Sequence, residues 1–195
     1  MMIAIVVRHG ASAHSTVNNI RVDTGLTEAG EAQIRESAAK LCREHGGNRF
    51  PVKKIFTSAE KRAAQSAAIC ASAEYLNISP EKIYEAPDLN PVDIRSLDFS
   101  ALNDLIIQEK KPWYEYWLNG FPGFEDQSAF QDRVIDAFEK ISLGLKDDYV
   151  LFVVHEEIFW AIITYKLFKN EKTTDMLSVA RKYKILHGEK RFYLF

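Results

Sequence analysis

The hydrophobic pattern of the chain begins with a short apolar run at residues 3–7, and a similar run recurs at residues 149–154. Both runs are rich in β-branched residues and lack polar alternation, which is typical of strands covered on both faces of a parallel sheet. Shorter runs predict two further strands at 52–56 and 82–85. A closing pair of strands is predicted at 183–186 and 191–195, joined by a His187-Gly188 turn.

Segments with helical spacing alternate with these strands. Thr27 is the predicted N-cap of a helix whose apolar face continues to about residue 45. A narrow stripe that runs from Ala64 to Tyr75 predicts a second helix, which Asn77 and Pro80 end. Two later helices are predicted at 129–145 and 157–168.

This alternation predicts an α/β fold: a single-domain, three-layer αβα sandwich over residues 1–195, with a mostly parallel sheet. Residues 10–26 are polar and irregular, and we expect a loop that leaves the first strand and walls a pocket. The aromatic segment at about 100–124 predicts a small helical insertion with its own core, which could also roof that pocket.

Composition and charge narrow the class of protein. The 195 residues are 47% hydrophobic, and 25 basic against 27 acidic side chains give a net charge of -2. We therefore expect no nucleic-acid or membrane partner, and any attraction for anions must be local. The chain lacks a signal-like start and a bilayer-length apolar run, which favours a cytoplasmic protein. Cys42 and Cys70 are expected to be buried thiols, and the oligomeric state stays open.

Polar side chains follow three of the predicted strands at their carboxyl ends. Arg8 and His9 follow the first strand, Ser58 and nearby Arg62 the second, and His155 the strand at 149–154. These ends share one edge of a parallel sheet, so two arginines and two histidines are expected to converge there. Guanidinium groups grip phosphate oxygens, and an imidazole can act as a nucleophile. The pattern indicates phosphoryl chemistry.

At these positions the sequence resembles the histidine phosphatase superfamily, in its phosphoglycerate mutase-like branch. Arg8-His9-Gly10 matches the signature tripeptide of that family. Four further segments are similar to family motifs and follow in family order: 25–33 (like GLTxxGxxQA), 55–67 (like SSPLxRAxQTA), 122–125 (like PGGES) and 153–155 (like VSHG).

The resemblance implies a role for each residue. His9 attacks phosphorus and becomes phosphohistidine, which water then hydrolyses. Arg8, Arg62 and His155 bind the phosphoryl oxygens, with His155 most useful as a protonated donor, and Ser12 adds a hydroxyl donor. Because these groups supply the positive charge, no metal or other cofactor is expected.

The general acid of the family is absent from its usual place. Many relatives carry it as Glu in an LxExxxGxxEG loop, whereas residues 89–99 place Pro91 at that position. Asp93 is the first substitute to consider, Glu156 the second and Glu125 the third. Glu156-Glu157 also stands where the family commonly has glycines, which brings negative charge near the pocket.

Three functions compete on this basis. The first is a metal-independent phosphomonoesterase that hydrolyses a small phosphorylated metabolite through His9. The second is a non-catalytic phospho-ligand-binding or scaffold protein that has lost the acid. The third is a phosphoglycerate-type mutase, which needs a second anion site, and the basic side chains available for one are Arg21, Arg95, Lys110 and Lys111.

Overall fold

A computed structural model describes residues 2–17, 20–46, 49–94, 96–145, 147–167 and 176–195. Its main sheet has five strands in the order β5-β4-β6-β1-β7, and a separate hairpin pairs β2 with β3. The strands are β1 (Ile3–Arg8), β2 (Ser12–Val17), β3 (Ile20–Leu26), β4 (Val52–Thr57), β5 (Ile83–Glu85), β6 (Tyr149–Val154) and β7 (Lys190–Leu194). Four strands of the main sheet are parallel and only β7 is antiparallel, on β1. The predicted mostly parallel sheet is confirmed.

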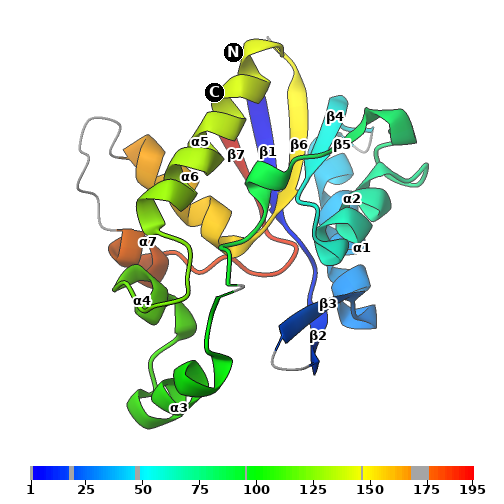
Figure 1. Cartoon of the computed structure of the whole chain (residues 1–195). Coiled ribbons are helices and arrows are strands. Elements are labelled where there is room, and N and C mark those ends of the chain that lie inside the picture. Colours follow the sequence, from blue (N-terminus) through cyan, green and yellow to red (C-terminus); the bar gives the residue numbers. More distant parts are fainter. Residues whose placement is uncertain (1, 18–19, 47–48, 95, 146, 168–175) are drawn as a thin grey trace.

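Helices cover both faces of this sheet (Figure 1). They are α1 (Glu28–Glu44), α2 (Lys61–Ala71), α3 (Phe99–Glu109), α4 (Trp113–Leu118), α5 (Gln127–Leu143), α6 (Glu156–Leu167) and α7 (Met176–Lys182), with short 3₁₀ turns η1 (Pro80–Lys82) and η2 (Pro87–Leu89). None of the described helices is long and apolar enough to cross a bilayer.

Successive residues of the central strands enter two separate cores. Ala4 and Val6 of β1 pack in a core with α5, α6 and α7, whereas Ile5 and Val7 pack in another with α1 and α2. The same alternation holds along β6. Because side chains alternate across a strand, a sheet covered on both faces requires an unbroken apolar run. The predicted αβα sandwich is confirmed.

Helix α1 begins where the sequence predicts. The Thr27 hydroxyl accepts a hydrogen bond from the Gly30 N–H at 3.0 Å, as an N-cap residue does. Helix α2 is shorter than predicted and ends at Ala71. The chain turns after Ala71, and Tyr75 packs in the α1/α2 core from this turn. The apolar spacing alone did not show whether Tyr75 enters the core from a continued helix or from a turn.

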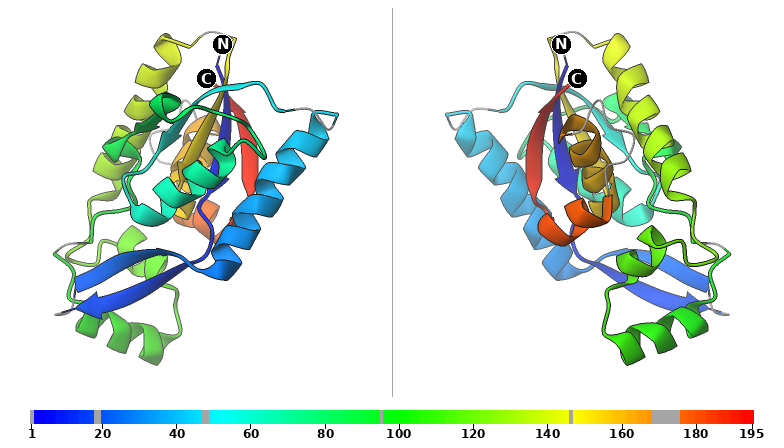
Figure 2. Two further views of the ribbon diagram at one scale, coloured as in Figure 1. Left: turned by 90° about the vertical axis from the view of Figure 1, so that its right-hand side faces the viewer. Right: turned by 90° about the vertical axis from the view of Figure 1, so that its left-hand side faces the viewer.

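Two predictions of local structure are wrong. Residues 10–26 contain the β2–β3 hairpin, which projects from the carboxyl edge of the sheet (Figure 2). Its strands pair with each other, so the segment forms a ladder without the apolar alternation of a core strand. Residues 183–186 form a loop after α7, and β7 pairs with β1 instead of with them.

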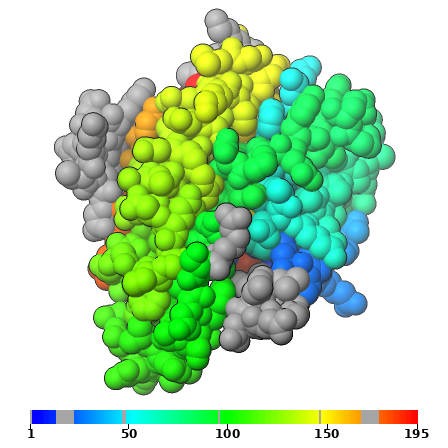
Figure 3. All heavy atoms as spheres, in the orientation of Figure 1, coloured from blue at the N-terminus to red at the C-terminus, as the bar shows by residue number. Residues whose placement is uncertain are grey.

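The insertion contains α3 and α4 and has a small core of its own, built around Leu97, Leu102 and Tyr116. In the space-filling view it forms a lobe at the lower end of the molecule, next to the surface of α5 (Figure 3). The cysteines Cys42 and Cys70 are free, as the sequence predicts.

Candidate active site

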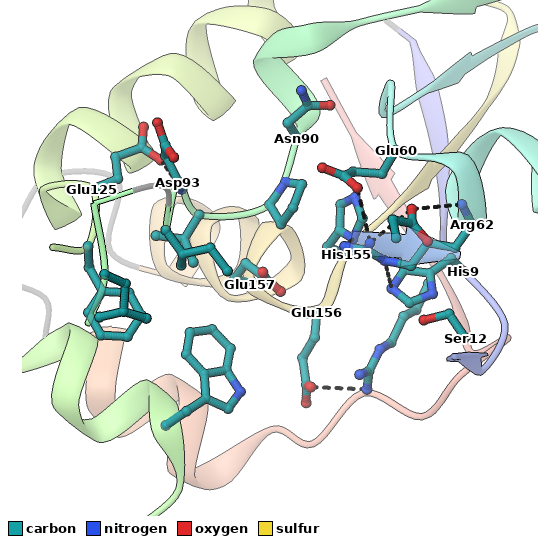
Figure 4. Close-up of a pocket in the computed structure, with 18 of the residues that line it drawn as sticks. His9, Ser12, Glu60, Arg62, Asn90, Asp93, Glu125, His155, Glu156 and Glu157 are labelled. Atoms are coloured by element: carbon teal, nitrogen blue, oxygen red, sulfur yellow. Dashed lines mark hydrogen bonds and ion pairs between the residues drawn. The ribbon is translucent and has the colours of Figure 1, made fainter. Parts of the chain in front are cut away.

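The carboxyl edge of the parallel strands opens into a pocket of about 920 Å³. His9 and His155 directly follow β1 and β6, and Arg62 lies in the first turn of α2. These residues line the pocket together with Arg8 and Ser12. The structure therefore brings together the charged and imidazole groups that the strand ends were expected to present (Figure 4).

His9 is buried and held in one orientation. Its Nδ1 lies 2.7 Å from the carbonyl oxygen of Gly10, so Nδ1 carries the proton and donates it. Its Nε2 then carries a lone pair, and the Arg62 Nε–H donates to it at 3.2 Å. Burial and the charge of Arg62 lower the pKa of His9 to about 3. The imidazole is thus neutral at neutral pH, with its unprotonated nitrogen facing the pocket.

His155 belongs to a hydrogen-bonded chain. Arg62 Nη2 lies 3.2 Å from His155 Nδ1, and because a guanidinium can only donate, Nδ1 accepts. His155 Nε2 therefore carries the proton and donates to the Ser58 hydroxyl at 2.8 Å. That hydroxyl donates in turn to the Asn90 side-chain oxygen at 2.8 Å.

Burial and nearby positive charge affect His155 as well. Desolvation lowers its pKa well below the usual value, and the charges on Arg62 and Arg8 act in the same direction. His155 is therefore neutral in this structure. The protonated donor expected from the resemblance requires a bound anion, whose negative charge would raise this pKa.

Arg62 contacts both histidines and two carboxylates of the site. Its Nη1 contacts two carboxylates, Asp23 at 3.0 Å and Glu60 at 3.1 Å, while its other two nitrogens face the histidines. Asp23 also accepts the backbone N–H of Arg62 at 3.1 Å, which ties the hairpin to the start of α2. These contacts fix the guanidinium before any anion binds.

Arg8 lies on the other side of His9. Its Nη1 is 3.0 Å from the Glu156 carboxylate and also donates to the carbonyl of Ile185. Its Nε is buried and has no hydrogen-bond partner within the described chain. Of the two carboxylates that the sequence predicted near the pocket, Glu156 is therefore paired with Arg8.

The candidate acids lie at different places. Asp93 and Glu125 are adjacent on the pocket wall opposite His9, whereas Glu156 is beside Arg8 (Figure 4). Arg133 binds Glu125 in a two-pronged ion pair, with contacts of 2.7 and 2.8 Å. The backbone N–H of Asp93 donates to the same carboxylate at 3.1 Å.

Sequence reasoning missed several residues of the pocket. They are Asp23 on β3, Glu60 before α2, Asn90 after η2, and His187, whose ring lies 5.5 Å from that of His9. Burial and the two arginines lower the pKa of His187 to about 4. The sequence marks it only as a turn residue; the Gly188 N–H donates to the Arg8 carbonyl at 3.0 Å and docks that turn on β1.

Much of the far half of the pocket is apolar, apart from the Asp93, Glu125 and Arg133 side chains. It is lined by side chains of the loop before the insertion and of the insertion itself: Val92, Ile94, Leu97, Phe99, Leu102, Trp113 and Phe124. Side chains of the insertion therefore line the pocket. Across the described residues, no three His, Cys, Asp or Glu side chains are grouped as metal ligands.

The protein is thus an α/β protein that holds two histidines and two arginines in one pocket at the carboxyl edge of its sheet, the edge where such sheets bind ligands. The family model described as the histidine phosphatase superfamily (branch 1) matches residues 4–182. The chain belongs to this superfamily. No curated protein is similar enough to match it.

Solved structures share the fold at low sequence identity. A YhfR protein of Bacillus stearothermophilus has a TM-score of 0.73 and 15% identity, covering 98% of this chain and 90% of its own. An alpha-ribazole phosphatase of Shigella flexneri has a TM-score of 0.66 and 18% identity, with coverage of 98% and 89%. A mycobacterial glucosyl-3-phosphoglycerate phosphatase has a TM-score of 0.69 and 16% identity, with coverage of 97% and 88%.

Proposed function

We propose that this protein is a metal-independent phosphomonoesterase that forms a phosphohistidine intermediate on His9. The observation that carries the proposal is the tautomer of His9. The bond from Nδ1 to the Gly10 carbonyl leaves the Nε2 lone pair in the pocket, 3.2 Å from an arginine that can hold a phosphoryl oxygen. A nucleophile and its charge-stabilising partner are thus adjacent.

In the first step, the Nε2 lone pair of His9 attacks phosphorus and the bond to the leaving oxygen breaks. The departing oxygen takes a proton from an acid in the pocket. In the second step, water attacks the phosphohistidine, the P–N bond breaks, and the water gives its proton to the carboxylate left by the first step. Phosphate leaves and His9 returns to its starting form.

The charged groups around His9 stabilise the transferred phosphoryl group. Arg62 Nε and Nη2 contact the two histidines, and they would donate to phosphoryl oxygens when a substrate enters between them. Arg8 adds a second guanidinium, and Ser12 a hydroxyl at the pocket wall. His155 becomes a donor once the dianion raises its pKa. With this charge in place, the chemistry has no need of a metal ion.

We propose that the substrate is a small phosphate ester whose leaving group has an apolar part. Solved structures that share the fold include an alpha-ribazole phosphatase and a glucosyl-3-phosphoglycerate phosphatase, both named for small phosphorylated compounds. The apolar half of the pocket, around Trp113 and Phe124, supports a leaving group that can bury hydrocarbon there.

The mutase alternative is less well supported. The basic side chains among the described pocket residues are Arg8, Arg62 and Arg133, and Arg133 is bound to Glu125. Lys111 pairs with Glu109 at 2.8 Å, outside this pocket. The side chains of Arg21 and Arg95 lie outside the described residues. A measurement of phosphatase activity decides between the enzyme and the non-catalytic binding protein.

The test is hydrolysis of p-nitrophenyl phosphate in the presence of EDTA, with the parent and His9→Ala compared. This ester has a good leaving group that needs little protonation, so it tests the nucleophile alone. We expect parent activity that survives EDTA and falls at least about 1000-fold in the variant, as for a lost covalent nucleophile. An inactive, folded parent that binds vanadate would favour the binding protein, and full activity in His9→Ala would refute the mechanism.

A further inference from the structure

The proposed reaction needs a proton donor that can reach the leaving oxygen, and both carboxyl oxygens of two candidates are already bound by other groups. Both oxygens of Glu125 are occupied, by Arg133 and by the Asp93 N–H. Both oxygens of Glu156 are occupied as well, one by Arg8 at 3.0 Å and one by the Ile185 N–H at 3.2 Å. Asp93 lies beside Glu125 on the wall opposite His9 (Figure 4).

Glu60 lies on the same side of the pocket as the reacting groups (Figure 4). Its carboxylate contacts Arg62 Nη1 at 3.1 Å, while the Nε and Nη2 of the same guanidinium contact His9 and His155. A phosphoryl group held by Arg62 would therefore contact the same guanidinium as this carboxyl group. The Glu60 side chain is 34% exposed, so it can meet a substrate that enters the pocket.

The backbone holds Glu60 in this place. Residue 60 is the N-cap of α2, yet its side chain makes no capping hydrogen bond and turns into the pocket instead. Its N–H donates to the Ser58 hydroxyl at 3.2 Å, the same hydroxyl that binds His155. Glu60 and the second histidine are thus positioned by one serine at the end of β4.

We propose that Glu60 is the proton donor to the leaving oxygen, and that Asp23 is the positioning residue that keeps the proton on it. This inference rests on the proposed phosphatase function. After the proton leaves, the Glu60 carboxylate takes the proton of the attacking water, so the cycle closes without another acid.

The environment of this pair supports the assignment. Burial raises the pKa of Glu60, and the hydrogen bond and negative charge of Asp23 act in the same direction, although Arg62 opposes this. The pKa of Asp23 is lowered, chiefly by the backbone N–H groups of Arg62 and Gly25 and by the Arg62 charge, although burial opposes this. Adjacent carboxyl groups whose pKa values move apart provide one proton donor and one fixed negative charge. The remaining titratable groups near Glu60 are His9 and His155, beyond the Arg62 guanidinium.

The experiment compares Glu60→Gln with the parent on two esters, p-nitrophenyl phosphate and a simple alkyl phosphate. Glutamine can still accept from Arg62 but cannot give up a proton. We expect kcat/KM to fall about 100-fold or more on the alkyl ester, and less than about 10-fold on the aryl ester. Vanadate binding and thermal melting check that the variant is folded and still binds an anion.

Two further variants make the result specific. Asp23→Asn removes the charge that favours protonated Glu60, so the basic limb of the alkyl-ester pH profile should move to lower pH. Glu28→Gln changes an exposed glutamate in the first turn of α1, and should leave both activities unchanged.

Several outcomes would overturn the assignment while the phosphatase function stands. Equal losses on both esters in Glu60→Gln would indicate a role in binding or in holding Arg62. A leaving-group-dependent loss in Asp93→Asn, with Glu60→Gln unaffected, would return the role to Asp93. An inactive parent on both esters, by contrast, would refute the proposed function itself.

Discussion

At the scale of single residues, the site keeps its imidazoles uncharged by burying them beside arginines. Burial and nearby arginines lower the pKa of His9 to about 3 and that of His187 to about 4, and burial also lowers the pKa of His155 well below its usual value. A neutral His9 has the lone pair that attack on phosphorus requires, so the pKa shift and the proposed chemistry agree. The lowered histidine pKa values also reduce the free energy of unfolding at acid pH.

The free energy of unfolding should decrease as the pH falls from about 6.5 to about 4. In this window the unfolded chain takes up protons on histidines that the folded site leaves unprotonated, so protons favour the unfolded state. Urea denaturation at several pH values measures this slope. His9→Gln should have a shallower slope than the parent, because it removes a histidine that stays unprotonated in the folded site. Identical slopes in the parent and His9→Gln would contradict the burial argument.

At the scale of elements, the end of β1 and the start of α1 approach too closely for side chains. A Cβ added at Gly10 would lie 2.2 Å from the Gly30 oxygen, and one at Gly30 would lie 1.9 Å from the Ala11 oxygen. The Ser66 hydroxyl accepts from the Gly10 N–H at 3.2 Å and donates to the Arg62 carbonyl at 2.8 Å. The close approach of Gly10 to Gly30, together with the Ser66 hydrogen bonds, fixes the position of His9 relative to Arg62.

Gly30→Ala should therefore lower both stability and activity. The overpacked contact should cost about 1–3 kcal/mol in the free energy of unfolding, because backbone on both sides must move. Urea denaturation and p-nitrophenyl phosphate hydrolysis measure the two effects. Gly144→Ala is the matched control, since a Cβ there meets nothing within 4 Å. A Gly30→Ala variant as stable as the parent would show that the two elements can separate at little cost.

At the scale of the whole molecule, Arg133 joins the helix α5 to the loop that forms one wall of the pocket. It binds Glu125 in two contacts and donates to the backbone carbonyls of Asp88, Asn90 and Pro91 at 2.7 to 3.0 Å. Asn90 in turn receives the hydrogen bond from Ser58 that orients His155. The geometry of the sheet edge thus depends on a helix on the outer layer.

Arg133→Lys keeps the charge but cannot reproduce this fork of contacts. We expect a loss of about 1–3 kcal/mol in the free energy of unfolding, in the range of hydrogen bonds to charged groups, together with a several-fold fall in kcat/KM. The control is Lys140→Ala, which removes an exposed ion pair with Asp136 on the same helix and should change stability by less than about 0.5 kcal/mol. Parent-like stability and activity in Arg133→Lys would show that the loop holds its position unaided.

The layers of the fold and the gathering of Arg8, His9, Arg62 and His155 were predictable from the sequence. Unbroken apolar runs record burial on both faces, and the direction of parallel strands places their carboxyl ends together. Both signals are local, because each strand carries its own burial pattern and its own polar end.

The tertiary structure decided which distant polar groups meet. The β2–β3 hairpin has no core pattern, yet its position brings Asp23 to Arg62, and the end of β4 brings Glu60 to the same guanidinium. Residues 183–186 have strand-like composition, but β7 takes the open edge of β1. Which loop or strand contacts which depends on how the segments pack after the sheet has formed, and no local pattern in the sequence records this. The sequence by itself thus determined the layers and the phosphoryl-binding edge, and the packing of loops around that edge decided which carboxyl group stands beside the nucleophile.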